Sequence, residues 1–236
     1  MKILGIIPAR SGSKGIPGKN SKLLQGHPLI HYTAASAAKS ALLSTCIVST
    51  DSQAIAASVQ SFGIQAPFIR PPALALDSTP SIDVVVHALN YFESNNIFFD
   101  AICLLQPTSP FRLPGFIDDC IKKFIDTNAD TLFSTQPVPH TYHPNWVFKK
   151  TEHDFLVHAC GNEEMIAQRQ LLPEAYIRDG SIYIVKTTCV QGRKTFYGNK
   201  MTHLPSPPQW YVNIDTPHDW ERAELIAKAY IDQVGI

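Results

Sequence analysis

Basic side chains and glycines alternate directly after the first apolar run of the sequence. The run covers residues 3–7, and the residues that follow Pro8 include Arg10, Gly12, Lys14, Gly15, Gly18 and Lys19. Glycine lets backbone N–H groups approach a ligand closely, while the cations supply positive charge at the same place. This loop therefore predicts a polyphosphate site. The alternative is an ordinary Gly/Pro turn with solvated lysines.

Two common phosphate motifs do not account for this loop. A Walker loop needs Gly, four residues and then Gly-Lys-Ser/Thr. Here Ser13 stands at the first glycine position and Asn20 at the hydroxyl position. The pattern G-x-G-x-x-G also fails, because the glycines fall at 12, 15 and 18. The sequence indicates a different way of holding phosphate.

Asp215 is the candidate metal ligand. Magnesium takes one or two carboxylates together with phosphate oxygens and water, so a single aspartate after a strand is sufficient. The alternative is that Asp215 only supports the turn before a helix. That helix has a strong start, with Thr216 as N-cap, Pro217 in the first turn and Asp219 three residues after the cap.

Short apolar segments alternate with amphipathic ones along most of the chain. Strands are expected at 3–7, 46–50, 68–69, 101–105, 131–134, 180–185 and 210–212, and helices at 28–43, 53–62, 81–94, 116–127 and 216–230. This alternation is typical of βαβ units and predicts an α/β fold with a mostly parallel central sheet and helices on both faces. Ligands of such sheets gather at the carboxyl ends of the strands. The loops 8–20, 50–52, 70–80 and 106–112 are expected to meet there.

The alternation breaks down from about residue 138 to 176. This stretch mixes prolines, histidines and aromatic residues without a helical or strand period. Loops longer than about 12–15 residues are uncommon unless they are functional or contact something. We interpret the stretch as an insertion that projects from the sheet, the alternative being a long surface excursion.

Composition excludes several classes of protein. The 236 residues, 44% of them hydrophobic, suit a single domain over 1–236. Twenty basic and twenty acidic residues give zero net charge, without the basic excess of a nucleic-acid-binding protein. Five cysteines without a C-x-x-C pair indicate neither a zinc site nor a disulfide framework. No apolar run is long enough to cross a membrane, and a cytoplasmic location is expected.

Residues 8–20, Pro-Ala-Arg-Ser-Gly-Ser-Lys-Gly-Ile-Pro-Gly-Lys-Asn, resemble the nucleotide-binding signature of the acylneuraminate cytidylyltransferases, the CMP-sialic acid synthetases. The resemblance covers nearly the whole chain, with further matching segments at 70–81, 106–110, 169–173, 179–183 and 214–216. It implies a Rossmann-like nucleotidyltransferase that joins CTP to an acidic nine-carbon ulosonic acid with Mg²⁺, giving a CMP-sugar and pyrophosphate. It also implies a homodimer, in which the insertion lends residues to the partner's sugar site.

The resemblance assigns roles to matching residues. Catalytic roles are implied for Arg10, Lys14, Lys19 and Arg169. Contacts with the nucleotide are implied for Arg10, Asn20, Arg70, Thr79 and Ser81. Contacts with the sugar are implied for Gln106, Arg169, Asp179 and Tyr183. Metal binding is implied for Asp215, with Asn213 beside it.

Two positions depart from the family pattern. Asn213 stands where the family often has a second aspartate, and it offers a carbonyl oxygen without charge. Asp179 stands where many sialate enzymes have asparagine. A negative side chain there repels a carboxylate but accepts hydrogen bonds from hydroxyl or amide groups. A relative of sialic acid, such as legionaminic or pseudaminic acid, is therefore among the expected substrates.

Two alternative functions are kept. Enzymes for the eight-carbon acid Kdo have an acidic Q-G-D-E-P type segment where this chain has Gln-Pro-Thr-Ser-Pro at 106–110, and they lack Ser-Lys-Gly in the loop. The Kdo reading therefore ranks lower. A non-catalytic sugar-nucleotide binding protein is the other alternative, since fold does not fix function. It predicts CTP binding without turnover.

Overall fold

A six-stranded sheet forms the centre of the protein in this computed structural model, which describes residues 1–161 and 165–235. The strand order is β10-β6-β9-β5-β1-β4. The strands are β1 (Ile3–Pro8), β4 (Thr45–Ser49), β5 (Ala101–Leu105), β6 (Thr131–Pro137), β9 (Tyr176–Lys186) and β10 (Met201–Pro205). Neighbours pair in parallel except at β9, which runs antiparallel to both β5 and β6. The prediction of a mostly parallel sheet is confirmed.

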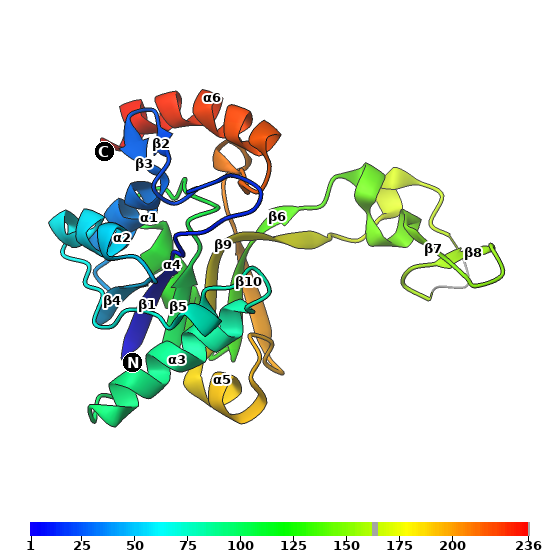
Figure 1. Cartoon of the computed structure of the whole chain (residues 1–236). Helices are drawn as coiled ribbons and strands as arrows, with labels where there is room; N and C mark the ends of the chain where they lie inside the picture. Colours follow the sequence, from blue (N-terminus) through cyan, green and yellow to red (C-terminus); the bar gives the residue numbers. More distant parts are fainter. Residues whose placement is uncertain (162–164, 236) are drawn as a thin grey trace.

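Helices cover both faces of this sheet (Figure 1). In β1, Ile3 and Ile7 face one apolar cluster while Leu4 and Ile6 face the other, because side chains alternate along a strand. The first cluster is completed by α1 (Leu29–Ala38), α2 (Gln53–Ser58) and α4 (Phe116–Asp126). The second is completed by α3 (Ser81–Ser94) and α5 (Thr187–Arg193). The last helix, α6 (Pro217–Val234), packs against α1 in a third cluster.

The helix boundaries follow the expected signals with two differences. The Thr216 hydroxyl accepts from the N–H of Asp219, whose carboxylate accepts from the N–H of Thr216, so α6 begins with a capping box. Gly63, at φ 75°, ends the short 3₁₀ helix Gln60–Phe62 that follows α2. However, α1 ends at Ala38 rather than near residue 43, and α6 continues beyond residue 230. The small strands β2 (Leu23–Leu24) and β3 (His27–Pro28) form a hairpin before α1.

Three expectations for individual elements were wrong. The last strand is β10 rather than a strand at 210–212, where Trp210 ends the 3₁₀ helix Pro208–Trp210 and residues 211–212 are irregular. Two successive prolines, Pro207 and Pro208, cannot donate to a strand ladder. The segment 68–69 makes only an isolated bridge, Thr50 to Ile69. Helix α5 was not expected.

An arm projects from the sheet between β6 and β9 (Figure 1). The two strands leave the sheet as a paired stem whose last pair is Pro137 and Tyr176, at the bounds expected for the insertion. The arm is more regular than its sequence indicated. It contains the hairpin β7 (Phe148–Lys150) with β8 (Leu156–His158) and the 3₁₀ helices His140–Tyr142, Pro144–Trp146 and Arg169–Leu171. Within the described residues, no helix combines the length and hydropathy of a membrane span.

Candidate active site

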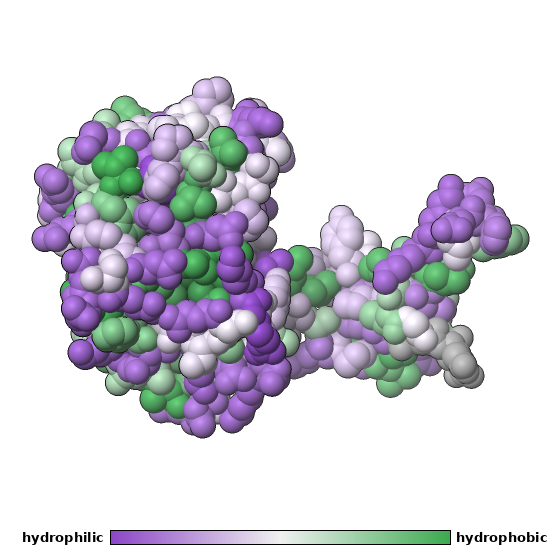
Figure 2. All heavy atoms as spheres, turned by 60° about the horizontal axis from the view of Figure 1, so that its bottom comes forward, coloured by the Kyte–Doolittle hydropathy of each residue, from purple (hydrophilic) through white to green (hydrophobic). Residues whose placement is uncertain are grey.

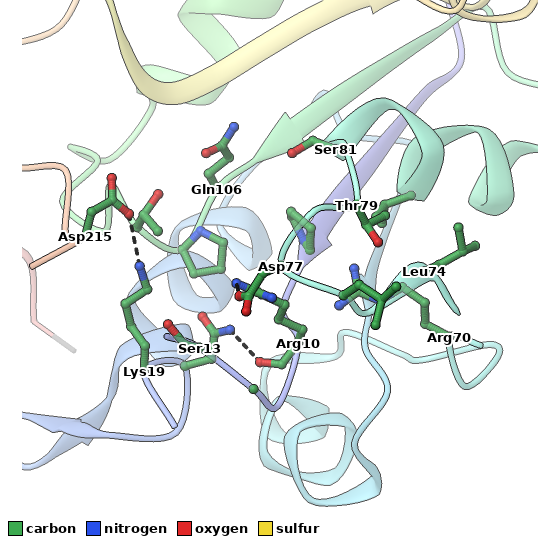
Figure 3. Close-up of a pocket in the computed structure, with 17 residues that line it drawn as sticks. Arg10, Ser13, Lys19, Arg70, Leu74, Asp77, Thr79, Ser81, Gln106 and Asp215 are labelled. Carbon is green, nitrogen blue, oxygen red and sulfur yellow. Dashed lines mark hydrogen bonds and ion pairs between the residues drawn. The ribbon is translucent and has the colours of Figure 1, made fainter. Parts of the chain in front are cut away.

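A pocket of about 250 Å³ lies at the carboxyl ends of β1 and β5, where the fold rule places ligands. The loop after β1, the segment 70–84 and the turn after β5 all contribute to its walls, together with Asp215. In Figure 3, Lys19 and Asp215 lie on one side of the pocket, and Arg70 and Leu74 lie on the opposite side. The predicted site residues that line it are Arg10, Lys19, Asn20, Arg70, Thr79, Ser81, Gln106 and Asp215.

The loop after β1 is held in shape by side chains and leaves part of its backbone free. The N–H and Oγ of Ser11 donate to the Asp51 carboxylate at 2.8 and 2.6 Å, which fastens the loop to the end of β4. Asn20 Nδ2 donates to the Arg10 carbonyl at 2.9 Å. Among the described residues, the N–H groups of Gly12 and Ser13 have no hydrogen-bond partner, and both residues line the pocket. These groups are available to an anion.

Lys19 joins the loop to the candidate metal ligand. The residue is only 9% exposed. Its Nζ donates to the Ile214 carbonyl at 2.5 Å and lies 3.1 Å from Asp215 Oδ1 (Figure 3). The backbone of the loop also approaches the backbone of Asp215 closely at Gly15. A Cβ built at Gly15 would lie 2.2 Å from the Asp215 carbonyl oxygen. The loop and the segment 213–215 therefore form one unit.

Two cations of the loop after β1 pair with the same carboxylate, that of Asp77, for which the sequence predicted no role. Arg10 and Lys14 both form ion pairs with Asp77, the lysine at 3.5 Å. Asp77 lines the pocket, so an anion that binds these two cations would have to displace this carboxylate. The available signal was the acidic residue within the matching segment 77–81, but sequence does not show which cation it meets.

Arg70 is the least solvated cation in the pocket, at 3% exposure. Its Nε and Nη2 have no hydrogen-bond partner among the described residues. Burial lowers the pKa of Arg70, and its interaction with Asp51 opposes that shift. Buried donors without acceptors are costly, so this guanidinium is suited to a ligand that supplies acceptor oxygens or nitrogens. Ser81 lines the same pocket from the first turn of α3, whose N-cap residue, Pro80, makes no side-chain capping hydrogen bond.

Three of the predicted sugar-site residues lie away from the pocket lining. Asp179 is buried, and its carboxylate accepts from the hydroxyls of Ser134 and Ser206 at 2.5 Å each and from the Ser181 N–H at 2.8 Å. The Tyr183 ring packs between the rings of Phe133 and Phe196 in the second core cluster. Arg169 is on the arm. Their contacts with a sugar stay predictions.

The metal candidates provide one carboxylate and one amide. Asn213 Nδ2 donates to Asp215 Oδ2 at 2.6 Å. Within the described part of the chain, no three His, Cys, Asp or Glu side chains gather as a metal cluster. One exposed carboxylate beside a phosphate loop fits Mg²⁺, which keeps several waters and phosphate oxygens, better than a metal that needs a full set of protein ligands.

Comparison with known proteins gives a consistent result over the whole chain. The family model described as "Cytidylyltransferase" matches residues 4–232. A CMP-N,N'-diacetyllegionaminic acid synthase of Legionella pneumophila is 35% identical, with 96% of each chain covered. A pseudaminic acid cytidylyltransferase of Campylobacter jejuni is 28% identical, with 97% of each covered. An N-acylneuraminate cytidylyltransferase of Escherichia coli is 40% identical over 95% of this chain, which spans 52% of that relative.

Solved structures share the fold. A CMP:2-keto-3-deoxy-manno-octonic acid synthetase complexed with CTP aligns with a TM-score of 0.70 at 17% identity, covering 97% of this chain and 99% of the other. A 4-diphosphocytidyl-2C-methyl-D-erythritol synthase from Anaerococcus prevotii aligns with a TM-score of 0.66 at 9% identity, covering 96% and 98%. Because the family model matches residues 4–232, nearly the whole chain, this chain belongs to the cytidylyltransferase family of nucleotidyltransferases.

Proposed function

We propose that this chain transfers the cytidylyl group of CTP to an acidic nine-carbon ulosonic acid, giving the CMP-sugar and pyrophosphate. The observation that carries this proposal is one pocket lined by the loop cations Arg10 and Lys19, by Gly12 and Ser13 with their free backbone N–H groups, by the buried Arg70 and by Asp215. The relatives support the sugar class, because they are named for legionaminic, pseudaminic and N-acylneuraminic acids.

In this mechanism the loop after β1 binds the triphosphate. Arg10 and Lys14 exchange Asp77 for phosphate oxygens, and Gly12 and Ser13 donate backbone N–H groups to them. The anomeric hydroxyl of the sugar attacks the α-phosphorus and releases its proton to solvent. A new P–O bond forms while the bond to pyrophosphate breaks. Negative charge then grows on the leaving pyrophosphate, and the cations already bound to its oxygens stabilise that charge.

The remaining roles divide between the walls of the pocket. Arg70, Asn20, Thr79 and Ser81 bind the cytidine, with the unpaired guanidinium donors of Arg70 meeting its acceptor atoms. Gln106 binds the sugar. Asp215, with Asn213 beside it, holds Mg²⁺, which when bound neutralises charge on phosphate oxygens.

The proposal is tested by measuring pyrophosphate release with each nucleoside triphosphate against a panel of ulosonic acids. We expect turnover with CTP and a nine-carbon acid, and none with UTP, ATP or GTP. Turnover with Kdo alone would support the eight-carbon alternative. CTP binding without release of pyrophosphate from any pair would support the non-catalytic alternative.

We further propose that the arm forms a homodimer and carries Arg169 into the partner's site. Figure 2 shows hydrophobic side chains standing among hydrophilic ones on the arm. Several large apolar or aromatic residues of the arm are strongly exposed: Tyr142 (72%), Phe155 (71%), Leu156 (66%) and Leu171 (63%). A second copy of the arm would bury them. Arg169 does not line the pocket at the carboxyl ends of β1 and β5 in its own chain, which fits a role across the interface.

Mixing two inactive variants tests this arrangement. Arg169→Ala and Lys19→Met are each expected to be nearly inactive alone. After unfolding and joint refolding at equal amounts, about a quarter of wild-type activity should return, because half of the dimers are mixed and each has one intact composite site. If activity stays at the level of the separate variants, Arg169 does not act across an interface.

Gly15→Ala should lower kcat/KM about 10²-fold, because a Cβ at this position meets the Asp215 carbonyl oxygen at 2.2 Å and a shift of about 1 Å in a site has that order of effect. The matched control is Gly192→Ala on α5, where the new methyl meets nothing within 4 Å. Steady-state kinetics and thermal unfolding of both variants provide the readout. Equal activity of the two would show that the approach of the loop to Asp215 is unimportant.

Asn213→Asp should increase the dependence on magnesium. The new carboxylate would stand beside Asp215, where the Asn213 amide now donates at 2.6 Å, and two close carboxylates repel each other unless a cation lies between them. We expect a lower half-saturating Mg²⁺ concentration and a Tm that rises with added Mg²⁺ more than in the wild type. An unchanged Mg²⁺ titration would place residue 213 outside the metal site.

A further inference from the structure

Arg112 lies inside the protein beneath the turn that carries Gln106. The residue is 2% exposed. Its Nη2 donates to the carbonyl oxygens of Gln106 at 2.8 Å and Ser181 at 2.7 Å, and its Nη1 donates to Thr33 Oγ1 at 3.0 Å. One planar group therefore joins the carboxyl end of β5 to β9 and to α1.

This cation is unusual because all three of its acceptors are neutral. Burial lowers the pKa of Arg112 to about 10, so the guanidinium remains charged at neutral pH. A buried charge without a carboxylate in contact is unfavourable, and an apolar side chain of similar volume is often as stable or more so. Stability alone is a poor explanation for arginine at this position.

The side chain of Gln106 depends on its backbone for its position. Within the described residues, its amide group makes no hydrogen bond, and it points into the pocket between Asp215 and Ser81 (Figure 3). The backbone carbonyl oxygen of Gln106 accepts hydrogen bonds from Arg112 and, at 3.2 Å, from the Ser109 N–H. Arg112 therefore fixes the base of a side chain whose far end is free for a ligand.

The rest of the turn has separate anchors. The Thr108 carbonyl accepts from the Ile214 N–H at 2.8 Å, and Ser109 Oγ donates to the Asp179 carbonyl at 3.0 Å. Loss of Arg112 should consequently release Gln106 more than Thr108 or Ser109. The effect should be confined to the part of the pocket that Gln106 forms.

We propose that Arg112 is a positioning residue, which holds Gln106 in the orientation that binds the ulosonic acid. The planar fork is the essential feature, because a single ammonium cannot reach the Gln106, Ser181 and Thr33 acceptors together. This inference rests on the proposed role of Gln106 in the sugar site.

Arg112→Lys is the first test, with Arg193→Lys on the exposed face of α5 as the matched control. We expect Arg112→Lys to raise KM for the ulosonic acid about tenfold, the factor that corresponds to loss of one charge-assisted hydrogen bond. The KM for CTP should change by less than about twofold, and Arg193→Lys should change neither. In a Gln106→Ala background, Arg112→Lys should add less than about twofold, since residues that act together are not additive.

Thr33→Val is a second, independent variant, which tests the proposal even if Arg112→Lys folds poorly. It removes one acceptor of the fork from a buried position outside the pocket lining. We expect about a threefold rise in KM for the ulosonic acid, as for loss of a neutral hydrogen bond. A lowered Tm with unchanged KM for the ulosonic acid and for CTP would overturn the proposal. So would an equal effect of Arg112→Lys on the KM for the ulosonic acid in the wild-type and Gln106→Ala backgrounds.

A readout without turnover separates this proposal from the proposed function. The side-chain amide signals of Gln106 in an NMR spectrum are assigned by their loss in Gln106→Ala. Arg112→Lys should shift or broaden them and leave those of Gln191 on α5 unchanged. Unmoved Gln106 signals would overturn the positioning role. If these signals move while the wild type converts no ulosonic acid, the proposed function fails and the positioning role stands.

Discussion

Lys19→Met should lower kcat about 10²-fold, the order observed when one preorganised donor is removed from a transition-state site. Methionine keeps the length of the buried side chain but removes the ammonium. The Ile214 carbonyl and the Asp215 carboxylate then lose the donor that holds them at 2.5 and 3.1 Å. Charge stabilisation and the position of the proposed metal ligand are lost together, which is why a large effect is expected.

The control for this variant is Lys122→Met on α4, which removes an equal charge from an exposed ion pair with Asp119. Its kcat should match the wild type, because exposed pairs contribute little. Steady-state pyrophosphate release at saturating substrates gives kcat, and thermal unfolding shows whether Lys19→Met remains folded. A folded Lys19→Met protein with wild-type kcat would remove the buried ammonium from the mechanism.

Asp215→Asn should lower kcat about 10²- to 10³-fold and abolish the response to magnesium, because the segment 213–215 then offers no carboxylate to a divalent cation. The replacement keeps the shape of the side chain and its place beside Asn213, so the change is one of charge. The rate should remain low at every Mg²⁺ concentration.

Asp232→Asn on α6 is the matched control, since that carboxylate is exposed and lies outside the pocket lining. Titration of Mg²⁺ into metal-free protein, followed by pyrophosphate release, should give the wild-type curve for this control. An Asp215→Asn protein with the wild-type midpoint would show that the cation binds elsewhere.

Much of the fold follows from local signals in the sequence. The apolar runs at β1, β4 and β5 and the capping box of α6 have short-range physical causes, and the structure has these elements. The direction of β9 could not be predicted, because an alternating pattern is the same for a parallel and an antiparallel strand. The edge strand β10 was missed because its residues are only partly buried and form no apolar run.

The location of the pocket was more predictable than its internal contacts. The rule that ligands gather at carboxyl strand ends predicted that loops 8–20, 50–52, 70–80 and 106–112 meet. Residues of three of these loops line the pocket, and loop 50–52 contributes none of the lining residues. The pairing of Asp77 with Arg10 and Lys14 depends on side-chain geometry across separate loops. The same is true of Asp179, whose carboxylate is engaged by Ser134 and Ser206 rather than facing the pocket.

The proposed function requires that the pocket between the loop after β1 and the start of α3 binds CTP. The most direct measurement is an NMR titration of isotope-labelled protein with CTP and Mg²⁺, observing backbone amides. If CTP binds in this pocket, we expect saturable shifts of the Gly12, Ser13 and Ser81 amide signals and an unchanged amide signal of Gly192 on α5. Undisturbed Gly12, Ser13 and Ser81 amides at saturating CTP would contradict it.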